Sequence, residues 1–184
     1  QRQMCIRDSQ DTPSTPEILA KIPLLKREDI EKKAETFFWK EKEEGGIKVL
    51  HHNFFTSGIG YLKVLFNTEV LTQEDLPYAG LLKSILGSIS TEHYSYSDLT
   101  SEIHLNSGGV DFSVTSYPDL ADPERFTGAF VASIRVLYDK LDFGFTILEE
   151  ILNHSVFTDE KRLGEVIQET RSRAKMKLEN AGHS

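Results

Sequence analysis

Apolar and polar residues follow two different patterns between Thr91 and Thr115, first with helical spacing and then in strict alternation. Leu99 and Ile103 are four positions apart, which places both on one face of a helix. Ser95 or Ser97 can accept hydrogen bonds from the free amides of the first helical turn. The pattern therefore predicts a capped, amphipathic helix in the first part of this stretch.

This helix is predicted to end at Gly108-Gly109, because glycine tolerates the left-handed conformation with which a chain leaves a helix. Val110, Phe112 and Val114 then alternate with polar residues, so a strand with one dry and one wet face follows. A second segment of clear alternation runs from Phe126 to Leu137. Both segments predict strands of an antiparallel sheet.

Aromatic and aliphatic residues also gather in Thr36–Lys40 and Ile47–Phe55, on either side of the charged sequence E-K-E-E-G-G. This arrangement predicts a β-hairpin. A turn at Thr56–Gly58 leads into the alternating segment Tyr61–Asn67, which we interpret as part of a second strand pair. We expect the aromatic residues of this region to lie in the core rather than to form a ligand cage. They are Phe37, Phe38, Trp39, Phe54 and Phe55.

Three further segments have apolar residues at helical spacing. The first ends at Gly87 and begins either at an N-cap, Thr72, or nearer Pro77. The second covers Leu141–Leu152, and the third runs from its cap at Thr158–Glu160 along a stripe that reaches Leu178. The predicted order is β-β-β-α-α-β-β-α-α. This order is typical of an α+β fold with helices on one face of a mainly antiparallel sheet.

Composition divides the chain into three parts. Residues 1–9 resemble a translated sequencing adapter, so we interpret them as a non-native leader and set Cys5 aside with them. Residues 10–35 are rich in proline and charge, which is typical of a linker or hinge connector. Residues 36–184 would then form the α+β domain. We expect that domain to be incomplete at its C-terminal end, since no closing element follows the last helix.

The net charge of −8, from 21 basic and 29 acidic residues, argues against a nucleic-acid partner. An acidic surface aids solubility and would suit basic ligands. No apolar run approaches the ~20 residues that cross a bilayer, so we expect no membrane partner. A single cysteine cannot form an internal disulfide and fits a reducing compartment, which favours the cytoplasm.

Six histidines occur, and none stands in H-E-x-x-H or H-x-x-E-H, which would place zinc ligands and a proton-accepting glutamate on one helical face. His51 and His52 are neighbours on a predicted strand and point to opposite faces, which disfavours a shared metal. His93 follows Glu92 without a third ligand in view, so we expect a capping or turn role. No nucleophile elbow or phosphate-binding loop appears. We therefore predict no catalytic residue, metal ligand or cofactor in this chain and assign no substrate-binding residue.

Four runs of sequence, taken in order, resemble a known family. They are H-H-N-F-F-T-S-G-I-G-Y-L-K-V-L-F-N-T, L-P-Y-A-G-L-L-K-S-I-L-G, T-E-H-Y-S-Y-S-D-L and N-S-G-G-V-D-F-S-V. This series is similar to the third domain of the insulinase (pitrilysin) family of metallopeptidases, in its presequence-protease subfamily. The segment I-P-L-L-K-R-E-D-I similarly resembles the connector that enters that domain. The resemblance covers nearly all of residues 22–184.

The resemblance implies that this chain is one segment of a larger enzyme. Members of the family consist of four related α+β domains in two hinged halves, which close around unfolded peptides and cleave them with zinc. The zinc ligands and the catalytic glutamate belong to the first domain, upstream of this segment. The segment would therefore be inactive alone and would form chamber wall in the non-catalytic half. Its partners would be the other domains of the polypeptide and peptide substrates, and the strand Val110–Thr115 could offer them a sheet edge.

Two alternatives stay open. The chain could belong to a non-catalytic scaffold or binding protein with the same fold, like the inactive core subunits of respiratory complexes. An H-x-x-E-H motif encoded upstream would argue against that alternative. The chain could also be an independent hydrolase that uses His51, His52 or His93, which a zinc analysis of the purified chain would test.

Overall fold

The computed structural model describes residues 13–30, 32–33 and 37–179. The residues interpreted as a leader, 1–9, lie outside this described part. The chain divides into two compact units, residues 1–54 and 55–184. The described residues between 13 and 33 are all exposed, and their regular structure consists of a single-turn helix, α2 (Pro16–Leu19), and a short 3₁₀ turn.

The first unit contains a hairpin of β1 (Lys40–Glu44) and β2 (Ile47–His51). Gly45 and Gly46 form its two-residue turn, and both have positive φ, which glycine adopts without strain. The predicted hairpin is present, but the position predicted for its first strand is wrong. The charged sequence K-E-K-E-E is strand rather than turn, because the two glycines fix the register of the pairing. Of the predicted first strand, Thr36–Lys40, residues 37–39 precede β1 and Lys40 is the first residue of β1. Thr36 lies outside the described residues.

The prediction that the aromatic residues of this region form a core is wrong. Phe37, Phe38 and Trp39 are 60%, 60% and 55% exposed, and Phe54 is 42% exposed. A two-stranded ribbon supplies no second layer that could bury them within its own unit. Phe37 and Phe54 contact each other edge to face, with ring centroids 5.6 Å apart. Phe55, the first residue of the second unit, is 96% exposed.

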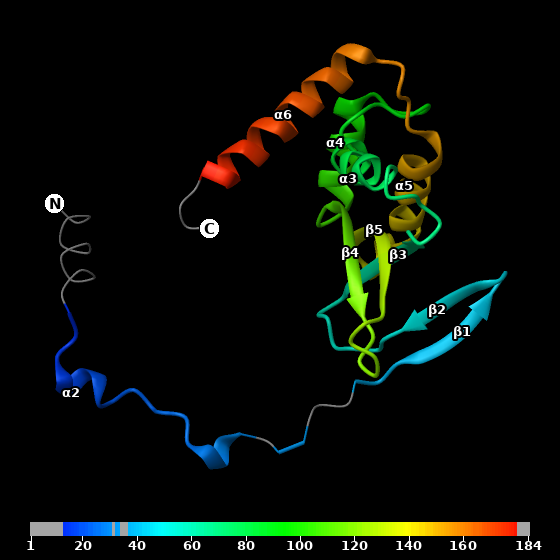
Figure 1. Cartoon of the computed structure of the whole chain (residues 1–184). Helices are drawn as coiled ribbons and strands as arrows, with labels where there is room; N and C mark the ends of the chain where they lie inside the picture. The colour runs from blue at the N-terminus through cyan, green and yellow to red at the C-terminus, as the bar shows by residue number, and fades with distance from the viewer. Residues whose placement is uncertain (1–12, 31, 34–36, 180–184) are drawn as a thin grey trace. The chain divides into compact units, whose positions relative to one another are not determined.

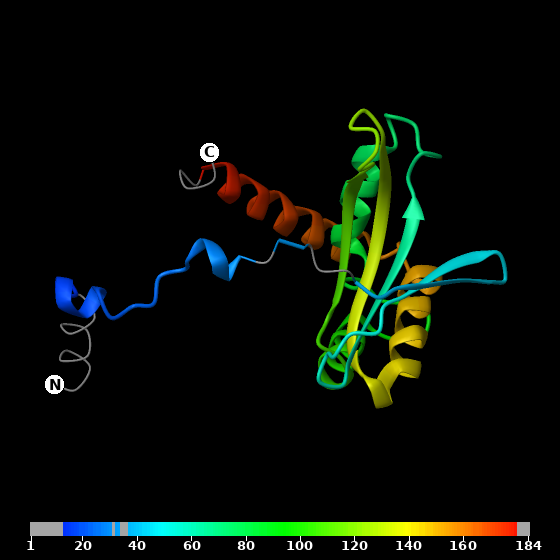
Figure 2. The same cartoon turned by 90° about the horizontal axis from the view of Figure 1, so that it is seen from below.

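The second unit is built on a three-stranded antiparallel sheet of β3 (Ile59–Asn67), β4 (Val110–Pro118) and β5 (Phe126–Leu137). The strand order is β3-β5-β4, so β5 lies between its two neighbours (Figures 1 and 2). The bounds of β5 are those that its alternation predicts. The partner of β3 is β5, and not the strand that precedes β3 along the chain.

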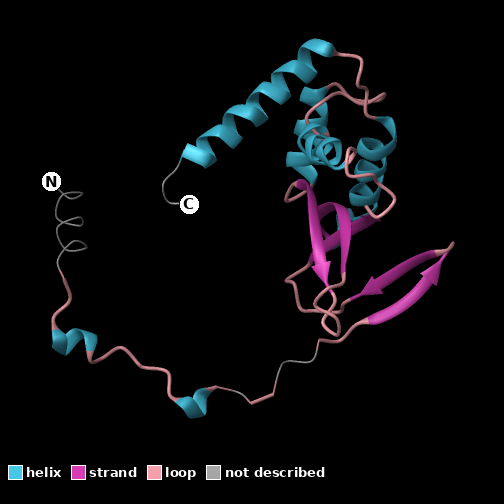
Figure 3. Ribbon diagram, in the orientation of Figure 1, coloured by secondary structure: helices cyan, strands magenta, loops and turns pink. Residues whose placement is uncertain are grey.

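Four helices of the second unit follow in the predicted order. Figure 3 shows helices in cyan and strands in magenta. They are α3 (Leu76–Ile85), α4 (Tyr96–Asn106), α5 (Leu141–His154) and α6 (Glu160–Glu179). Within the part of the chain that the structure describes, no helix combines the length and the apolar composition that a membrane span requires. The α+β class and the element order predicted from the sequence are confirmed.

The core lies between one face of the sheet and helices α3, α4 and α5. Every second side chain of β5 faces it, and Ala132, Ile134 and Val136 are at most 2% exposed. Burial of each large aliphatic side chain contributes roughly 1.5–3 kcal/mol to folding. The partners of these β5 residues in the cluster include Leu86, Leu99, Ile103, Ile147, Leu148 and Ile151. A smaller cluster of Ile85, Ile89 and Val166 attaches α6 to α3.

The cap of α4 decides between the two serines proposed from the sequence. Ser95 is the N-cap, and its Oγ accepts a hydrogen bond from the amide of Asp98 at 3.2 Å. The same hydroxyl donates to the Asp98 carboxylate at 2.7 Å. The chain leaves the helix at Ser107, which is extended, so the predicted exit at the glycines is wrong; Gly109, with a φ of +105°, stands directly before β4.

The cap predicted at Thr72 is wrong, whereas the alternative start of α3 nearer Pro77 and the cap segment predicted for α6 are confirmed. The helix α3 begins at Leu76 with Asp75 before it, and Thr72 donates its amide and its hydroxyl to the Asp75 carboxylate instead of capping the helix. At α6, Asp159 accepts the amide of Arg162 at 2.9 Å, so the cap lies within the predicted segment Thr158–Glu160. The carboxylate of Asp159 thus satisfies a free amide in the first turn of α6, where carboxylates are strong acceptors.

Replacing the N-cap should weaken the whole second unit, because α4 is part of its core. We expect Ser95→Ala to lower the free energy of unfolding by about 1 kcal/mol. The exposed Ser97, which is the other candidate cap, provides the matched control, and Ser97→Ala should change stability by less than about 0.5 kcal/mol. Urea denaturation followed by circular dichroism measures both variants. Equal stabilities for the two variants would contradict the assignment.

Candidate functional site

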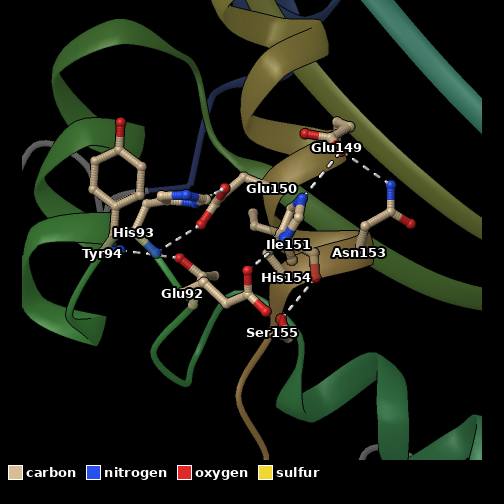
Figure 4. Close-up of polar contacts among 10 residues, drawn as sticks. Glu92, His93, Tyr94, Glu149, Glu150, Ile151, Asn153, His154 and Ser155 are labelled. Carbon is tan, nitrogen blue, oxygen red and sulfur yellow. Dashed lines mark hydrogen bonds and ion pairs between the residues drawn. The ribbon is translucent and has the colours of Figure 1, made fainter.

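Carboxylate and imidazole side chains gather where the last turn of α5 meets the loop that precedes α4 (Figure 4). Two elements that are far apart in the sequence supply them. We call this group the His–Glu cluster. It consists of Glu92, His93, Glu149, Glu150 and His154.

Backbone hydrogen bonds hold the two elements of the cluster together. The amide of Glu92 donates to the carbonyl of His154 at 2.9 Å, and the amide of Val156 donates to the carbonyl of Ser90 at 2.9 Å. Between them Thr91 and Ser155 form an isolated antiparallel bridge. The side chains therefore extend from a fixed backbone, which reduces the conformational entropy that the chain would lose on binding a ligand.

Glu150 is the buried member of the cluster, with 6% of its surface exposed. Its carboxylate accepts hydrogen bonds from the ring Nδ1 of His93 at 2.9 Å and from the backbone amide of His93 at 3.2 Å. Burial raises the pKa of Glu150, but the hydrogen bonds from the Thr91 hydroxyl and from His93 outweigh burial, so the pKa is lowered. The carboxylate is therefore held as a charged group beneath the loop.

His154 lies between two exposed carboxylates. Its Nδ1 is 3.0 Å from Oε2 of Glu92, and its Nε2 is 3.3 Å from Oε1 of Glu149. The hydrogen bond with Glu92 raises the pKa of His154 above its usual value, and the charge of Glu149 acts in the same direction. The ring of His93 stands edge to face against that of His154, with centroids 5.5 Å apart.

No lysine or arginine of the described chain forms an ion pair with the three carboxylates of the cluster. Their ion-pair partners are the two histidines alone. Three carboxylates against two imidazoles leave an excess of negative charge, even with both rings protonated. The cluster is thus suited to hold protons or a cation.

Three members of the cluster could act together as metal ligands. Glu149, Glu150 and His154 each offer one ligand atom, and these atoms lie within 4.8 Å of one another. Imidazole nitrogen and carboxylate oxygen are donors that zinc and similar metal ions accept. The neighbouring hydroxyls are already engaged, since Thr91 bonds Glu150 and Ser155 bonds the carbonyl of Ile151. The cluster therefore favours binding over nucleophilic chemistry.

Sequence reasoning identifies only part of this cluster. It considers Glu92 and His93 and assigns them a capping or turn role, whereas the amide and ring of His93 make long-range bonds to Glu150 on α5. It misses the three residues on α5. The spacing of Glu150 and His154, four apart on one helix, is a readable signal. The sequence gives no signal that these two residues will contact a loop nearly sixty residues earlier in the chain.

The other histidines considered as ligands lie elsewhere. His51 is the last residue of β2, and His52 stacks on Phe54 with ring centroids 5.9 Å apart, both within the first unit. His104 lies exposed in the last turn of α4. His183 is outside the described residues.

Comparison with known proteins finds a protein family whose model matches the whole chain. The family model described as "Peptidase M16-C associated" matches residues 1–184. The chain is 35% identical to Protein HypA of Clostridium perfringens over 178 residues, which are 97% of this chain and 18% of that protein. It is 27% identical to presequence protease 1, chloroplastic/mitochondrial, of Arabidopsis thaliana over 175 residues, which are 95% of this chain and 16% of that protein. The chain thus spans less than a fifth of these relatives.

Removing the buried carboxylate should destabilise the junction between the loop and α5. We expect Glu150→Ala to lower the free energy of unfolding by about 1–3 kcal/mol in metal-free buffer, because the Thr91 hydroxyl and the His93 amide lose their acceptor. The exposed neighbour supplies the control, and Glu149→Ala should cost less than about 0.5 kcal/mol. Denaturant unfolding compares the two variants. If both substitutions lowered the free energy of unfolding by the same small amount, Glu150 would not anchor the loop.

Proposed function

The chain belongs to the peptidase M16-C associated family, and from this premise we propose that it is a non-catalytic segment of a zinc-dependent oligopeptidase. In this proposal the parent enzyme encloses unfolded peptides in a chamber, and the present segment forms part of the chamber wall. The observation that carries the proposal is the family match along the entire chain together with the small share of each relative that the chain covers. A segment of that size would be one part of a longer polypeptide.

The arrangement of the sheet supports a role as a wall. Helices cover the face of the sheet that carries Ala132 and Ile134, and these residues are buried. The opposite face carries Tyr61 and Leu65 of β3, which are 58% and 52% exposed. A sheet with one covered and one open face can present a broad, preformed surface to an extended peptide.

The chemistry of cleavage would come from outside this segment. A zinc ion bound upstream would polarise the scissile carbonyl and activate a water molecule. The 184-residue sequence contains no H-x-x-E-H motif that could hold that ion. The contribution of this chain would be to confine the peptide, to exclude water on closure and to limit substrates by size. The acidic balance of the chain would favour basic peptides.

A scaffold or binding protein with the same fold is the second candidate. The absence of a zinc motif from this sequence is equally compatible with that function. The two candidates differ in what the remainder of the parent polypeptide encodes. A parent with an upstream H-x-x-E-H motif supports the peptidase, and a parent without such a motif supports the scaffold.

Activity should require the parent protein and not this chain alone. We expect the purified 184-residue chain to leave unfolded test peptides intact, while the parent cleaves them and loses activity in the presence of a chelator. A parent variant with glutamine in place of the motif glutamate is the control, since it keeps the chamber and lacks the proton acceptor. Chelator-sensitive cleavage by the isolated chain would contradict the proposal, and so would an inactive parent.

The free edge of β4 allows the sheet-edge hypothesis to be tested. In the described sheet β4 pairs only with β5, so one row of its backbone groups is available to an added strand. In the parent enzyme we expect Val114→Pro to raise KM for peptides with little change in kcat, because the amide of Val114 faces the free edge of β4 and proline removes that donor. Thermal unfolding of the variant checks that the sheet survives. Unchanged kinetics in a folded variant would refute a peptide role for this edge.

A further inference from the structure

We propose that the His–Glu cluster is a binding site for a divalent transition-metal ion such as zinc. In this proposal the ligands are Nε2 of His154 and one carboxylate oxygen each from Glu149 and Glu150, with water in the remaining position. The proposal concerns residues of this chain alone and is independent of any peptidase activity. It goes beyond the sequence analysis, which predicts no metal ligand.

The first argument is the spacing between donor atoms. Two ligand atoms at about 2.0 Å from a tetrahedral zinc ion lie about 3.3 Å from each other. Nε2 of His154 and Oε1 of Glu149 are 3.3 Å apart. A hydrogen bond between opposite charges is usually shorter, at about 2.7–2.9 Å. The separation is thus the one that two ligands of a common ion adopt.

Glu150 completes the set after a small adjustment. The three ligand atoms lie within 4.8 Å of one another, which is wider than the spacing in a closed tetrahedral site. Glu149 can move inward because its side chain is 56% exposed. Glu150 is fixed by its bonds to His93, yet a carboxylate has about four lone-pair positions, so its oxygens retain acceptor capacity.

The second, independent argument is the partner of the other ring nitrogen of His154. Histidines that bind metals with one nitrogen nearly always donate the other N–H to a carboxylate, carbonyl or water, which fixes the tautomer and raises the basicity of the ligand. Nδ1 of His154 is 3.0 Å from Oε2 of Glu92. The arrangement Glu92–His154 therefore leaves Nε2 directed toward Glu149, as Figure 4 shows, with a ligand atom of Glu150 within 4.8 Å.

The third argument is charge. Within the described residues, Glu92, Glu149 and Glu150 have no lysine or arginine as ion-pair partner. A divalent cation would offset the excess negative charge more fully than one proton on His154 does. The backbone bonds between the loop and the end of α5 already fix the framework, so binding requires little reorganisation.

Titration calorimetry of the untagged 184-residue chain with zinc chloride tests the site. We expect uptake of about one zinc ion per chain. His154→Gln should abolish binding or weaken it more than about 100-fold, and Glu92→Gln should weaken it by about 10- to 100-fold through the lost support of the imidazole. Absence of zinc binding, or unchanged affinity in the His154 variant, would overturn the proposal and leave a proton-linked ion-pair cluster.

Two matched variants control for adventitious binding. His104→Gln removes an exposed helical histidine, and Glu169→Gln removes an exposed carboxylate that is paired with Arg173 on α6. Both should bind zinc as the unmodified chain does. A similar loss of affinity in either control would show that zinc binds the surface unspecifically.

X-ray absorption of the zinc-loaded, unmodified chain gives a second test that requires no variant to fold. We expect a shell of nitrogen and oxygen at about 2.0–2.1 Å, with the scattering signature of an imidazole ring. A shell of oxygen alone would exclude His154 as a ligand and refute the site. Failure of this test would leave the family assignment and the chamber-wall function untouched.

Discussion

The antiparallel pairing of β5 with both of its neighbours is the constraint on which the second unit depends. This strand lies in the middle of the sheet, so its backbone groups are satisfied on both sides and its apolar face is covered by helices. Ile134 and Val136 of β5 pack in the same cluster as Leu99 of α4 and Ile151 of α5. The strand between the helices therefore fixes their relative positions. The loops at the helix ends are positioned in the same way.

The His–Glu cluster is a consequence of this packing. The end of α5 and the loop before α4 meet because both helices rest on the same sheet face. The buried carboxylate of Glu150 then couples them further, since a charge removed from water must find hydrogen-bond donors and the loop supplies them through Thr91 and His93. In this arrangement of the loop, those hydrogen bonds offset the cost of burying the charge of Glu150.

Sequence reasoning recovers the features of the fold that local periodicity determines. The bounds of β5 and the start of α5 are predicted correctly, and the family resemblance drawn from four ordered runs is confirmed. The predicted cap segment of α6 is confirmed, but the cap predicted at Thr72 is wrong, because the side chain of Thr72 bonds Asp75 and α3 begins only at Leu76. The aromatic residues near the hairpin are predicted in a core because apolar composition alone does not reveal whether a second layer is present.

The candidate site could not be predicted for a related reason. Periodicity shows that Glu150 and His154 share a helix face, but it carries no information on which loop will cover that face. Two imidazoles and three carboxylates become a site only through contacts between positions about sixty residues apart. A chain whose sequence contains no H-x-x-E-H motif can therefore still concentrate ligating side chains, and in our proposal their role depends on the balance between a proton and a metal ion at His154. Glu92 and Glu149 set that balance, because their negative charges stabilise both a proton on the imidazole ring and a metal ion bound next to it.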